Sequence, residues 1–329
     1  MRAWRVEAWG EPEAMELRDV PIPDPGPGQV LIRNRAVSLN FFDVLQIQGK
    51  YQVKPAFPFT PGAELAGEVE ATGTGVKAFR VGDRVVGAPM LGALAEYTVC
   101  AERHVFPMAR QMSWSEGAAL PIVYQTSFFA LRDRGNLRYG EWLLVHAGAS
   151  GVGMSAIQIG RAWGARVIAT ASSEEKLAFA RAQGAEIALS YSDPQWVEEV
   201  KQITGMTGPG VGGADVIYDP VGGDVFDQST KCIAPGGRLL VVGFASGRIP
   251  SIAANRILLK NMSVVGVLWG NHVMANESYA RDTHAELSRM YEAGQIRPVI
   301  AQSLRLEEAV RGMRAFTGRQ VMGKVVVEL

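Results

Sequence analysis

The sequence predicts an α/β protein with two domains, a partly open β-barrel and a doubly wound parallel sheet. The chain has 329 residues, a natural length for two domains. From about residue 30 to residue 107, short apolar runs alternate with turns, which is typical of a barrel or sandwich-like β unit. From about residue 120, continuous apolar runs alternate with helical stretches, which is typical of βαβ units around a buried sheet.

The β-rich part begins after a Pro/Gly-rich loop at residues 21–28. A Thr-Gly-Thr-Gly turn at residues 72–75 separates two of its strands. Strands are expected at residues 30–32, 64–69, 82–86 and 95–99.

The second part reads as a regular alternation of strand and helix. Buried strands are expected at residues 142–147, 165–171, 215–218, 237–244 and 262–269. Helices are expected at residues 151–163, 173–183, 194–204, 222–232 and 252–260. A helix ending near Gly294, a helix at 306–317 and a strand at 324–327 then follow, and we expect this tail to return to the first domain.

Charge and hydropathy exclude several classes of partner. The chain has 33 Lys plus Arg and 33 Asp plus Glu, so it has no electrostatic footprint for nucleic acid or for an anionic membrane. No run of about 18 apolar residues is present, and the first residues lack the apolar core of a signal peptide. We therefore expect a cytoplasmic protein with no nucleic-acid or membrane partner.

Cysteine and histidine usage predicts neither a disulfide nor a metal site. Cys100 and Cys232 are far apart and belong to no C-x-x-C pair. The four histidines form no H-x-x-H or H-E-x-x-H pattern. We expect both cysteines to be small buried hydrophobes.

The strongest local signal is a G-x-x-G-x-G motif formed by Gly148, Gly151 and Gly153, between a buried strand and a helix. Gly148 is expected to permit a tight turn, Gly151 to let the backbone approach a pyrophosphate, and Gly153 to allow close helix–strand packing. The helix start at Gly151 and Val152 offers N–H groups and a positive dipole end to phosphates. The alternative is a glycine-rich helix entry that binds no ligand.

The end of the second strand favours NADPH over NADH as the cofactor. An NAD site usually carries Asp or Glu there, whereas this strand ends at Ser172 and Ser173, with Lys176 one helical turn further on. Two hydroxyls and an ammonium can bind a 2′-phosphate, which a carboxylate would repel. The two serines also suit a plain helix N-cap, and both interpretations can hold together.

A wider set of residues resembles a known signature: Gly140-Glu141, Leu144, residues 148–153, Gln158 and Arg161. With these, the chain resembles the zinc-independent quinone oxidoreductase (zeta-crystallin-like) branch of the medium-chain dehydrogenase/reductase superfamily, over essentially its whole length. Ser150 stands where this signature prefers glycine, and because serine can adopt ordinary dihedrals there we expect little effect. The resemblance implies a GroES-like catalytic domain at 1–120 and 271–329, and a Rossmann NADPH-binding domain at 121–270.

Other matches are spread along the chain. The segments 40–43, 59–64 and 82–85 are similar to the family's Asn-aromatic-x-Asp, Pro-Gly-x-Glu and Gly-Asp-Arg-Val motifs. The resemblance further implies that Thr126, at the start of a helix, lies near the nicotinamide, and that Tyr191 packs beside the adenosine phosphate. It implies three nicotinamide-pocket residues and one cofactor contact from the tail, namely Gly243, Phe244, Leu268 and Arg319. For Thr126, a helix-capping or core-facing hydroxyl is the alternative.

Zinc-dependent relatives carry a ligand Cys where this chain has Asn40 and a ligand His where it has Ala63, and their four-cysteine lobe has no counterpart between Asp83 and Glu96. Both zinc sites are therefore expected to be absent. Without a Lewis acid for alcohol oxidation, hydride transfer from NADPH suits an acceptor that delocalises negative charge, such as a quinone or an enone.

Two residues are candidates for contact with the acceptor. Asn40 fits a hydrogen bond to the acceptor or to the nicotinamide ribose, or a buried amide that closes a loop. Tyr51 fits a proton donor at the rim of the cleft, or a solvated or packing side chain. Asp43 fits a role in orienting the Asn40 loop, and the alternative is a local Asx turn. For Phe41 and Phe42, core packing is favoured over stacking on a quinone.

Three functions stay open. The leading hypothesis is an NADPH-dependent quinone or enone reductase, followed by an enoyl-thioester reductase, and then by a non-catalytic NADPH-binding structural or sensor protein. Lys50 and Lys54 fit attraction of an anionic acceptor or plain solvation. The apolar strand at 262–269 is expected to form a sheet edge through which a homodimer assembles.

Overall fold

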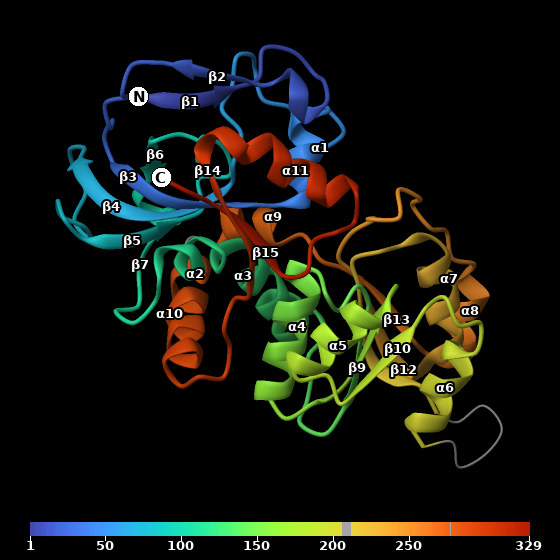
Figure 1. Ribbon diagram of the computed structural model, residues 1–329. Helices are drawn as coiled ribbons and strands as arrows, with labels where there is room; N and C mark the ends of the chain where they lie inside the picture. Colours follow the sequence, from blue (N-terminus) through green and yellow to red (C-terminus); the bar gives the residue numbers. More distant parts are fainter. Residues whose placement is uncertain (206–211, 277) are drawn as a thin grey trace. The chain divides into compact units, whose positions relative to one another are not determined.

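The computed structural model describes residues 1–205, 212–276 and 278–329 (Figure 1). The chain divides into two compact units. Unit 1 comprises Met1–Ile122, Asn276–Glu292 and Arg297–Leu329, and unit 2 comprises Val123–Ala275 and Ala293–Ile296. The boundary near residue 122 falls inside a helix, α3 (Pro121–Phe129).

Unit 1 is built around one long strand, β3 (Gln29–Leu39). One side of β3 pairs with β4 along almost its whole length, while the other pairs with β6 over residues 29–33 and with β15 over residues 36–39. Register shifts in the β3–β4 pairing bend the pair, which is how a sheet curls toward a barrel. In the described chain the sheet has the order β14-β15-β3-β4-β5-β7, with β6 paired to β3.

The remaining elements of unit 1 flank this sheet. The hairpin β1–β2 is antiparallel, and α11 packs closely on the sheet because a Cβ on Gly312 would come within 2.8 Å of Leu304 and Leu39. The other strands of the unit are β1 (Arg2–Arg5), β2 (Glu16–Asp19), β4 (Glu64–Thr72), β5 (Arg84–Gly87), β6 (Tyr97–Ala101), β7 (Val105–Pro107), β14 (Ile300–Arg305) and β15 (Lys324–Glu328). Its helices are α1 (Phe41–Ile47), α2 (Trp114–Ala118), α10 (Tyr279–Glu292) and α11 (Ala309–Thr317).

Unit 2 contains, within the described residues, a six-stranded parallel sheet of order β10-β9-β8-β11-β12-β13. The order reverses between β8 and β11, which makes their carboxyl ends a topological switch point. The strands are β8 (Trp142–Val145), β9 (Arg166–Ala171), β10 (Ile187–Ser190), β11 (Ala214–Asp219), β12 (Ile233–Val241) and β13 (Ser263–Gly266). The helices are α4 (Gly151–Ala162), α5 (Glu174–Ala182), α6 (Trp196–Ile203), α7 (Gly223–Cys232), α8 (Ala254–Lys260) and α9 (Trp269–Ala275).

The predicted fold class is confirmed, with local differences. Several short strands were not predicted, because three to six residues leave little pattern to detect, namely β1, β2, β7, β10 and β14. The helix that carries Thr126 begins at Pro121, so Thr126 lies in its second turn rather than at its start. The strands predicted at 237–244 and 262–269 end earlier, at Val241 and Gly266.

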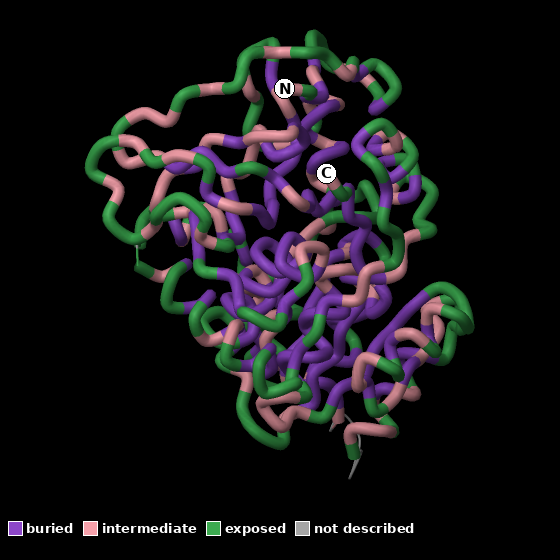
Figure 2. The backbone as a smooth tube through the Cα atoms, turned by 60° about the vertical axis from the view of Figure 1, so that its left-hand side comes forward, coloured by how far each residue is buried: buried purple, intermediate pink, exposed green. Residues whose placement is uncertain are grey.

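Burial follows the same pattern in both units. Figure 2 shows buried backbone along the central strands and exposed backbone along the connecting loops. All four residues of β8 are buried, and so are both cysteines, as predicted. Burial raises the pKa of the thiols of Cys100 and Cys232 to about 12. Among the described residues, no helix is long and apolar enough to span a membrane.

Candidate functional site

In unit 2 the glycine motif lies at the carboxyl end of β8, where it enters α4. Ser150 is the N-cap of that helix, with φ −76° and ψ 165°, and its hydroxyl accepts a hydrogen bond from the N–H of Gly153 at 3.1 Å. The expectation that serine takes ordinary dihedrals here is therefore confirmed. Gly151 and Val152 are the first two residues of the helix, so their N–H groups belong to those that an α-helix leaves unpaired.

Gly148 lies in a tight turn, as expected, because the N–H of Ser150 donates to the carbonyl of Ala147 at 2.8 Å. The left-handed backbone conformation of this turn is taken by Ala147, with φ 50°, and not by Gly148. Gly148 also permits close packing, because a Cβ there would lie 2.9 Å from the Cβ of Ala169. The backbone approaches a neighbour even more closely at Gly153, because a Cβ added there would lie 2.1 Å from the carbonyl oxygen of Ala147. The loop is thus folded back against the start of its own helix.

The next strand, β9, ends at a polar tip. Ser172 and Ser173 are exposed, and Ser173 caps α5 by accepting from the N–H of Lys176 at 3.4 Å. The ammonium of Lys176 lies 3.5 Å from the hydroxyl of Ser172. The N-cap interpretation of the serines is therefore correct, and the same geometry places two hydroxyls, an ammonium and a helix N-terminus together.

The other unit 2 candidates also follow the carboxyl ends of strands. Tyr191 follows β10, and its N–H donates to the carbonyl of Ala171 at the end of β9. Gly243 and Phe244 follow β12, and Leu268 follows β13. Because all the strands are parallel, their carboxyl ends lie along one edge of the sheet, where ligands of such folds bind.

Between these loops, Asp219 at the end of β11 organises its own turn. Its Oδ1 accepts from the N–H groups of Val221 at 2.8 Å and Gly222 at 2.9 Å. Burial raises the pKa of this carboxyl, and the two backbone hydrogen bonds oppose the shift. The N–H of Gly243 in turn donates to the carbonyl of Asp219 at 3.3 Å, so the loops after β11 and β12 are joined.

A buried imidazole lies directly before the glycine motif. His146 contacts the hydroxyl of Thr170 through Nδ1 at 2.7 Å and that of Ser229 through Nε2 at 2.8 Å. Thr170 belongs to β9 and Ser229 to α7, so the ring connects the start of the loop to two neighbouring elements. Burial lowers the pKa of His146 to about 3, and the ring is neutral at physiological pH.

In unit 1 a buried polar cluster surrounds Asn40, the residue that precedes α1. The Nδ2 of Asn40 donates to Glu64 Oε1 at 2.9 Å, and its Oδ1 accepts from the ammonium of Lys324 at 2.7 Å. That ammonium also donates to Glu64 Oε1 at 2.8 Å. The other oxygen of Glu64 accepts from the N–H of Ile122 at 2.7 Å, in the first turn of α3. Through these contacts the buried side-chain amide of Asn40 closes its loop.

Asp43 orients the same loop from the other side. Its Oδ2 accepts from the N–H of Asn40 at 2.7 Å, so the predicted contact between Asp43 and the Asn40 loop is present. Its Oδ1 is buried and has no hydrogen-bond partner among the described residues. Burial raises the pKa of this carboxyl from 3.8 to about 7, despite the hydrogen bond from Asn40 and the charge of Lys324.

Tyr51 is half-buried and its ring stacks on that of Phe42, with 5.3 Å between the ring centroids. Burial raises its pKa, and the charge of Asp43 acts in the same direction. The predicted core packing of the phenylalanine pair is wrong. Phe41 is 38% exposed and Phe42 is only partly buried, and the buried residues of the short helix α1 begin at Asp43.

Two further candidates lie on other elements. Thr126 is half-buried on α3. Arg319 is exposed just after α11 and has φ 54°, a left-handed conformation that is uncommon outside glycine. Such backbone conformations concentrate at functional sites, and Ala147 in the glycine motif is a second example.

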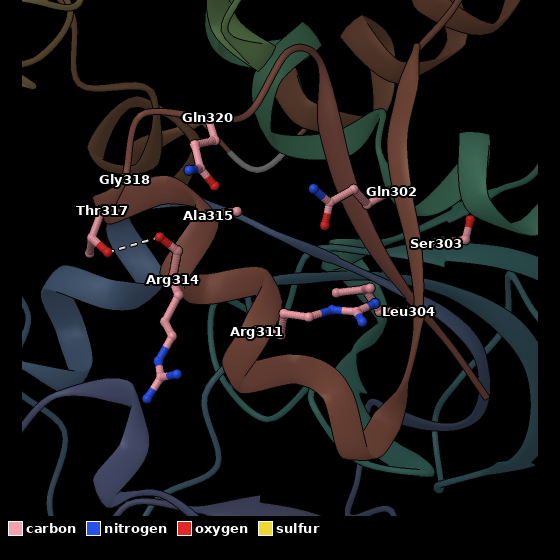
Figure 3. A pocket seen from close by; sticks show the side chains of 9 residues that line it. All are labelled: Gln302, Ser303, Leu304, Arg311, Arg314, Ala315, Thr317, Gly318 and Gln320. Atoms are coloured by element: carbon pink, nitrogen blue, oxygen red, sulfur yellow. Dashed lines mark hydrogen bonds between the residues drawn. The ribbon is translucent and has the colours of Figure 1, made fainter.

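A hollow of about 840 Å³ lies between β14 and α11 in unit 1 (Figure 3). Its two arginines are already paired, Arg311 with Glu308 at 3.1 Å and Arg314 with Glu13. None of the predicted site residues lines it. Within the described chain, no group of three or more His, Cys, Asp or Glu side chains is arranged to hold a metal ion.

Sequence reasoning did not identify the roles of Lys324 and His146. Lys324 carried a signal, because a lysine within an apolar strand segment either ends at the surface or needs a buried partner. His146 carried a weaker one, as a single polar residue at the end of an apolar run. Their partners are distant in sequence and could not be predicted from spacing.

Comparison with known proteins identifies two matching families. Residues 26–110 match the alcohol dehydrogenase GroES-like domain, and residues 151–286 match the zinc-binding dehydrogenase family. Quinone oxidoreductase-like protein 2 of Bos taurus is 37% identical over 305 residues, which cover 92% of this chain and 86% of the relative.

Two other relatives match over almost their full length. The quinone oxidoreductase of Pseudomonas aeruginosa is 36% identical over 323 residues, covering 97% of each chain. A mycobacterial protein solved in complex with NADPH has a TM-score of 0.93 at 30% identity, covering 100% of both chains. The chain therefore belongs to the medium-chain dehydrogenase/reductase superfamily, in the branch of the quinone oxidoreductases.

Proposed function

We propose that this protein is an NADPH-dependent reductase that transfers hydride to quinones or other conjugated carbonyl compounds. In this proposal unit 2 binds the cofactor. The observation that carries it is the carboxyl edge of the unit 2 sheet. There the glycine motif, the Ser172–Ser173 tip and the loops after β10, β12 and β13 lie along one edge, and the glycine motif follows β8, beside the reversal of strand order.

The residues at this edge fit NADPH. The N–H groups at the start of α4 suit a pyrophosphate, and Gly151, the first residue of that helix, has no side chain to obstruct its approach. The hydroxyls of Ser172 and Ser173 with the ammonium of Lys176 suit a 2′-phosphate. Solved quinone oxidoreductases of the same fold are NADPH complexes, which supports the same cofactor here.

The cofactor, when bound, supplies the hydride. The residues of unit 1 have to orient the acceptor and stabilise the oxygen on which negative charge develops. Tyr51 is suited to donate a hydrogen bond to that oxygen, because burial raises its pKa and its phenol stays protonated. Asn40 has one N–H whose contact, with the carbonyl of Ser38 at 3.4 Å, is long, and this N–H is suited to the acceptor oxygen or to a ribose hydroxyl.

The proposal includes catalysis without a metal ion. Zinc in such enzymes is bound by thiolate, imidazole or carboxylate groups. Asn40 and Ala63, which replace the ligand Cys and His of zinc-dependent relatives, offer an amide and a methyl group instead. A quinone or an enone carries the developing charge in its own π-system, so this reaction does not need a Lewis acid.

The decisive experiment is stopped-flow oxidation of NADPH with a panel of quinones, enones and enoyl thioesters. Rapid oxidation by quinones or enones supports the proposal, and turnover restricted to enoyl thioesters replaces it with the thioester reductase alternative. Thermal stabilisation by NADPH without consumption by any acceptor supports a binding or sensor role instead. Zinc chelation by EDTA should leave the rate unchanged, and a loss of rate would contradict the metal-free part.

We also propose a homodimer assembled through the free edge of β13. Two leucines on the preceding helix α8, Leu258 and Leu259, are 73% and 79% exposed, which is costly for a helix left in water. Multi-angle light scattering tests this, and a monomer at micromolar concentration would contradict it. The cytoplasmic location stays a prediction.

A further inference from the structure

We infer that Lys324 is a positioning residue which, together with Glu64, fixes the side-chain amide of Asn40 in one orientation. The three side chains belong to different parts of unit 1: Asn40 precedes α1, Glu64 begins β4 and Lys324 begins β15. Lys324 is 2% exposed and Glu64 is 0% exposed, so the cluster is shielded from water. The inference rests on the proposed reductase function only for its effect on turnover.

The chemistry of the two partners decides which way the amide points. An ammonium has only donors, so it has to face the Oδ1 of Asn40, which it does at 2.7 Å. The carboxylate of Glu64 has only acceptors, so it has to face the Nδ2, which it does at 2.9 Å. A flipped amide would place donor against donor and acceptor against acceptor. The orientation is therefore determined by the charges on both sides.

Lys324 itself has no capacity left for a ligand. Its three N–H groups donate to the carbonyl of Leu39 at 3.2 Å, to Asn40 Oδ1 at 2.7 Å and to Glu64 Oε1 at 2.8 Å. Any influence of this lysine on the reaction must therefore pass through its neighbours. The backbone of Asn40 is held as well, because its N–H donates to Asp43 at 2.7 Å.

The fixed amide keeps a defined donor available. The second N–H of Asn40 contacts the carbonyl of Ser38 at 3.4 Å, a long contact that a ligand oxygen can replace. The Asn40 side chain also faces the N–H of Asp43 in the capping box of α1, so the group left for a ligand is a donor, which matches a carbonyl oxygen. Loss of Lys324 would release the amide to rotate, and a misplaced contact of this kind costs as much as about a hundredfold in rate.

The first test measures orientation without any reaction. Protein labelled with ¹⁵N in asparagine gives side-chain amide signals, and the one absent from Asn40→Ala belongs to Asn40. We expect this signal to be sharp and slowly exchanging in the wild type and shifted or broadened in Lys324→Met. The control Lys77→Met removes an exposed lysine of the same unit and should leave the signal unchanged. An unchanged signal in Lys324→Met would overturn the inference.

The second test measures coupling in turnover. We expect Lys324→Met to lower kcat roughly tenfold or more, by more than it changes the Kd of NADPH. In the Asn40→Ala background the same change should cost less than about threefold, because there is no amide left to orient. An equal loss in both backgrounds would show a general structural role and would overturn the inference.

The inference stays testable when a variant does not fold and when the wild type shows no turnover. If Lys324→Met does not fold, Lys324→Met/Glu64→Gln, which removes both charges of the buried ion pair, replaces it in both tests. If the wild type oxidises no NADPH with any acceptor, the proposed function fails. The NMR result then still decides whether Lys324 orients Asn40.

Discussion

The Nε2 atom of His146 lies 2.8 Å from the hydroxyl oxygen of Ser229, in the interior of unit 2. That hydroxyl donates its own proton to the carbonyl of Val225 at 2.7 Å, so toward the ring it acts as an acceptor. Nε2 therefore carries the ring proton, and Nδ1 accepts from Thr170 at 2.7 Å. A second ring proton would face a donor, which agrees with the low pKa of this histidine.

We expect acid to destabilise the protein through His146. Its pKa falls from an ordinary value of 6.5 to about 3 on folding, so the unfolded chain binds more protons between these values. The free energy of unfolding is thus largest above about pH 6.5 and falls toward pH 3, by up to about 1.4 kcal/mol per pH unit from one site. His284 in unit 1, with a pKa lowered by burial to about 4, acts in the same direction.

Urea unfolding at pH 7, 6 and 5 tests this for the wild type and for His146→Asn. The variant should be less stable at each pH, but its stability should depend on pH with a slope shallower by about one proton. Equal slopes in the two proteins would show that His146 does not titrate on unfolding.

Asp43 should have the opposite effect. Its pKa rises from 3.8 to about 7 on folding, so the native state binds more protons in this window and stability falls as pH rises through it. Asp43→Asn removes the titration and keeps an oxygen for the N–H of Asn40. We expect the variant to gain stability relative to the wild type between pH 5 and pH 8, by a few kcal/mol at most. A difference that stays constant with pH would contradict the buried, titrating carboxyl.

Gly153→Ala should disrupt the glycine motif. The added methyl would lie 2.1 Å from the carbonyl oxygen of Ala147, so the loop and the helix start have to separate. We expect a loss of roughly 2–4 kcal/mol in unfolding free energy and a large increase in the Kd of NADPH. Gly270→Ala is the matched control, because a Cβ there meets no atom within 4 Å. A Gly153→Ala protein as stable as this control would refute the close approach.

Lys176→Ala should separate the two nicotinamide cofactors. The ammonium lies beside Ser172, at the end of β9 where a 2′-phosphate would bind, so its removal should weaken NADPH at least about tenfold and leave NADH almost unchanged. Fluorescence titration measures both constants. Lys201→Ala, which removes a lysine paired with Glu198 on α6, should change neither. Equal losses for the two cofactors would overturn the assignment of the 2′-phosphate site.

Local patterns in the sequence predict most of unit 2. Apolar runs, turn residues and the spacing of Gly148, Gly151 and Gly153 all depend on neighbours in sequence, and helix α4 begins where they indicate. The exception within the motif is Ala147, whose left-handed backbone is imposed by the packing of the loop rather than by the residue type. A second constraint on Gly148, the contact that a Cβ would make with Ala169, comes from a residue 21 positions away and could not be predicted from the motif.

The cluster around Asn40 could be predicted only in part. Resemblance identifies Asn40, Asp43 and Glu64 as members of motifs, but hydrogen-bond partners depend on which strands meet. Lys324 reaches Asn40, 284 positions away, because β15 pairs with β3, and no local pattern encodes that pairing. The exposure of Phe41 could not be predicted, because the sequence of an aromatic pair in a short helix does not show whether another element covers it.

The buried ion pair of Glu64 and Lys324 also has a consequence for folding during protein synthesis. The two residues are 260 positions apart, and nearly all of unit 2 is translated between them. On the ribosome, the Glu64 carboxylate therefore emerges long before its counter-ion, and unit 1 has to wait for the complete chain of unit 2 before its interior is neutralised. Unit 2 is thus able to fold first, and a prematurely released chain lacks the charge that completes the Asn40 cluster.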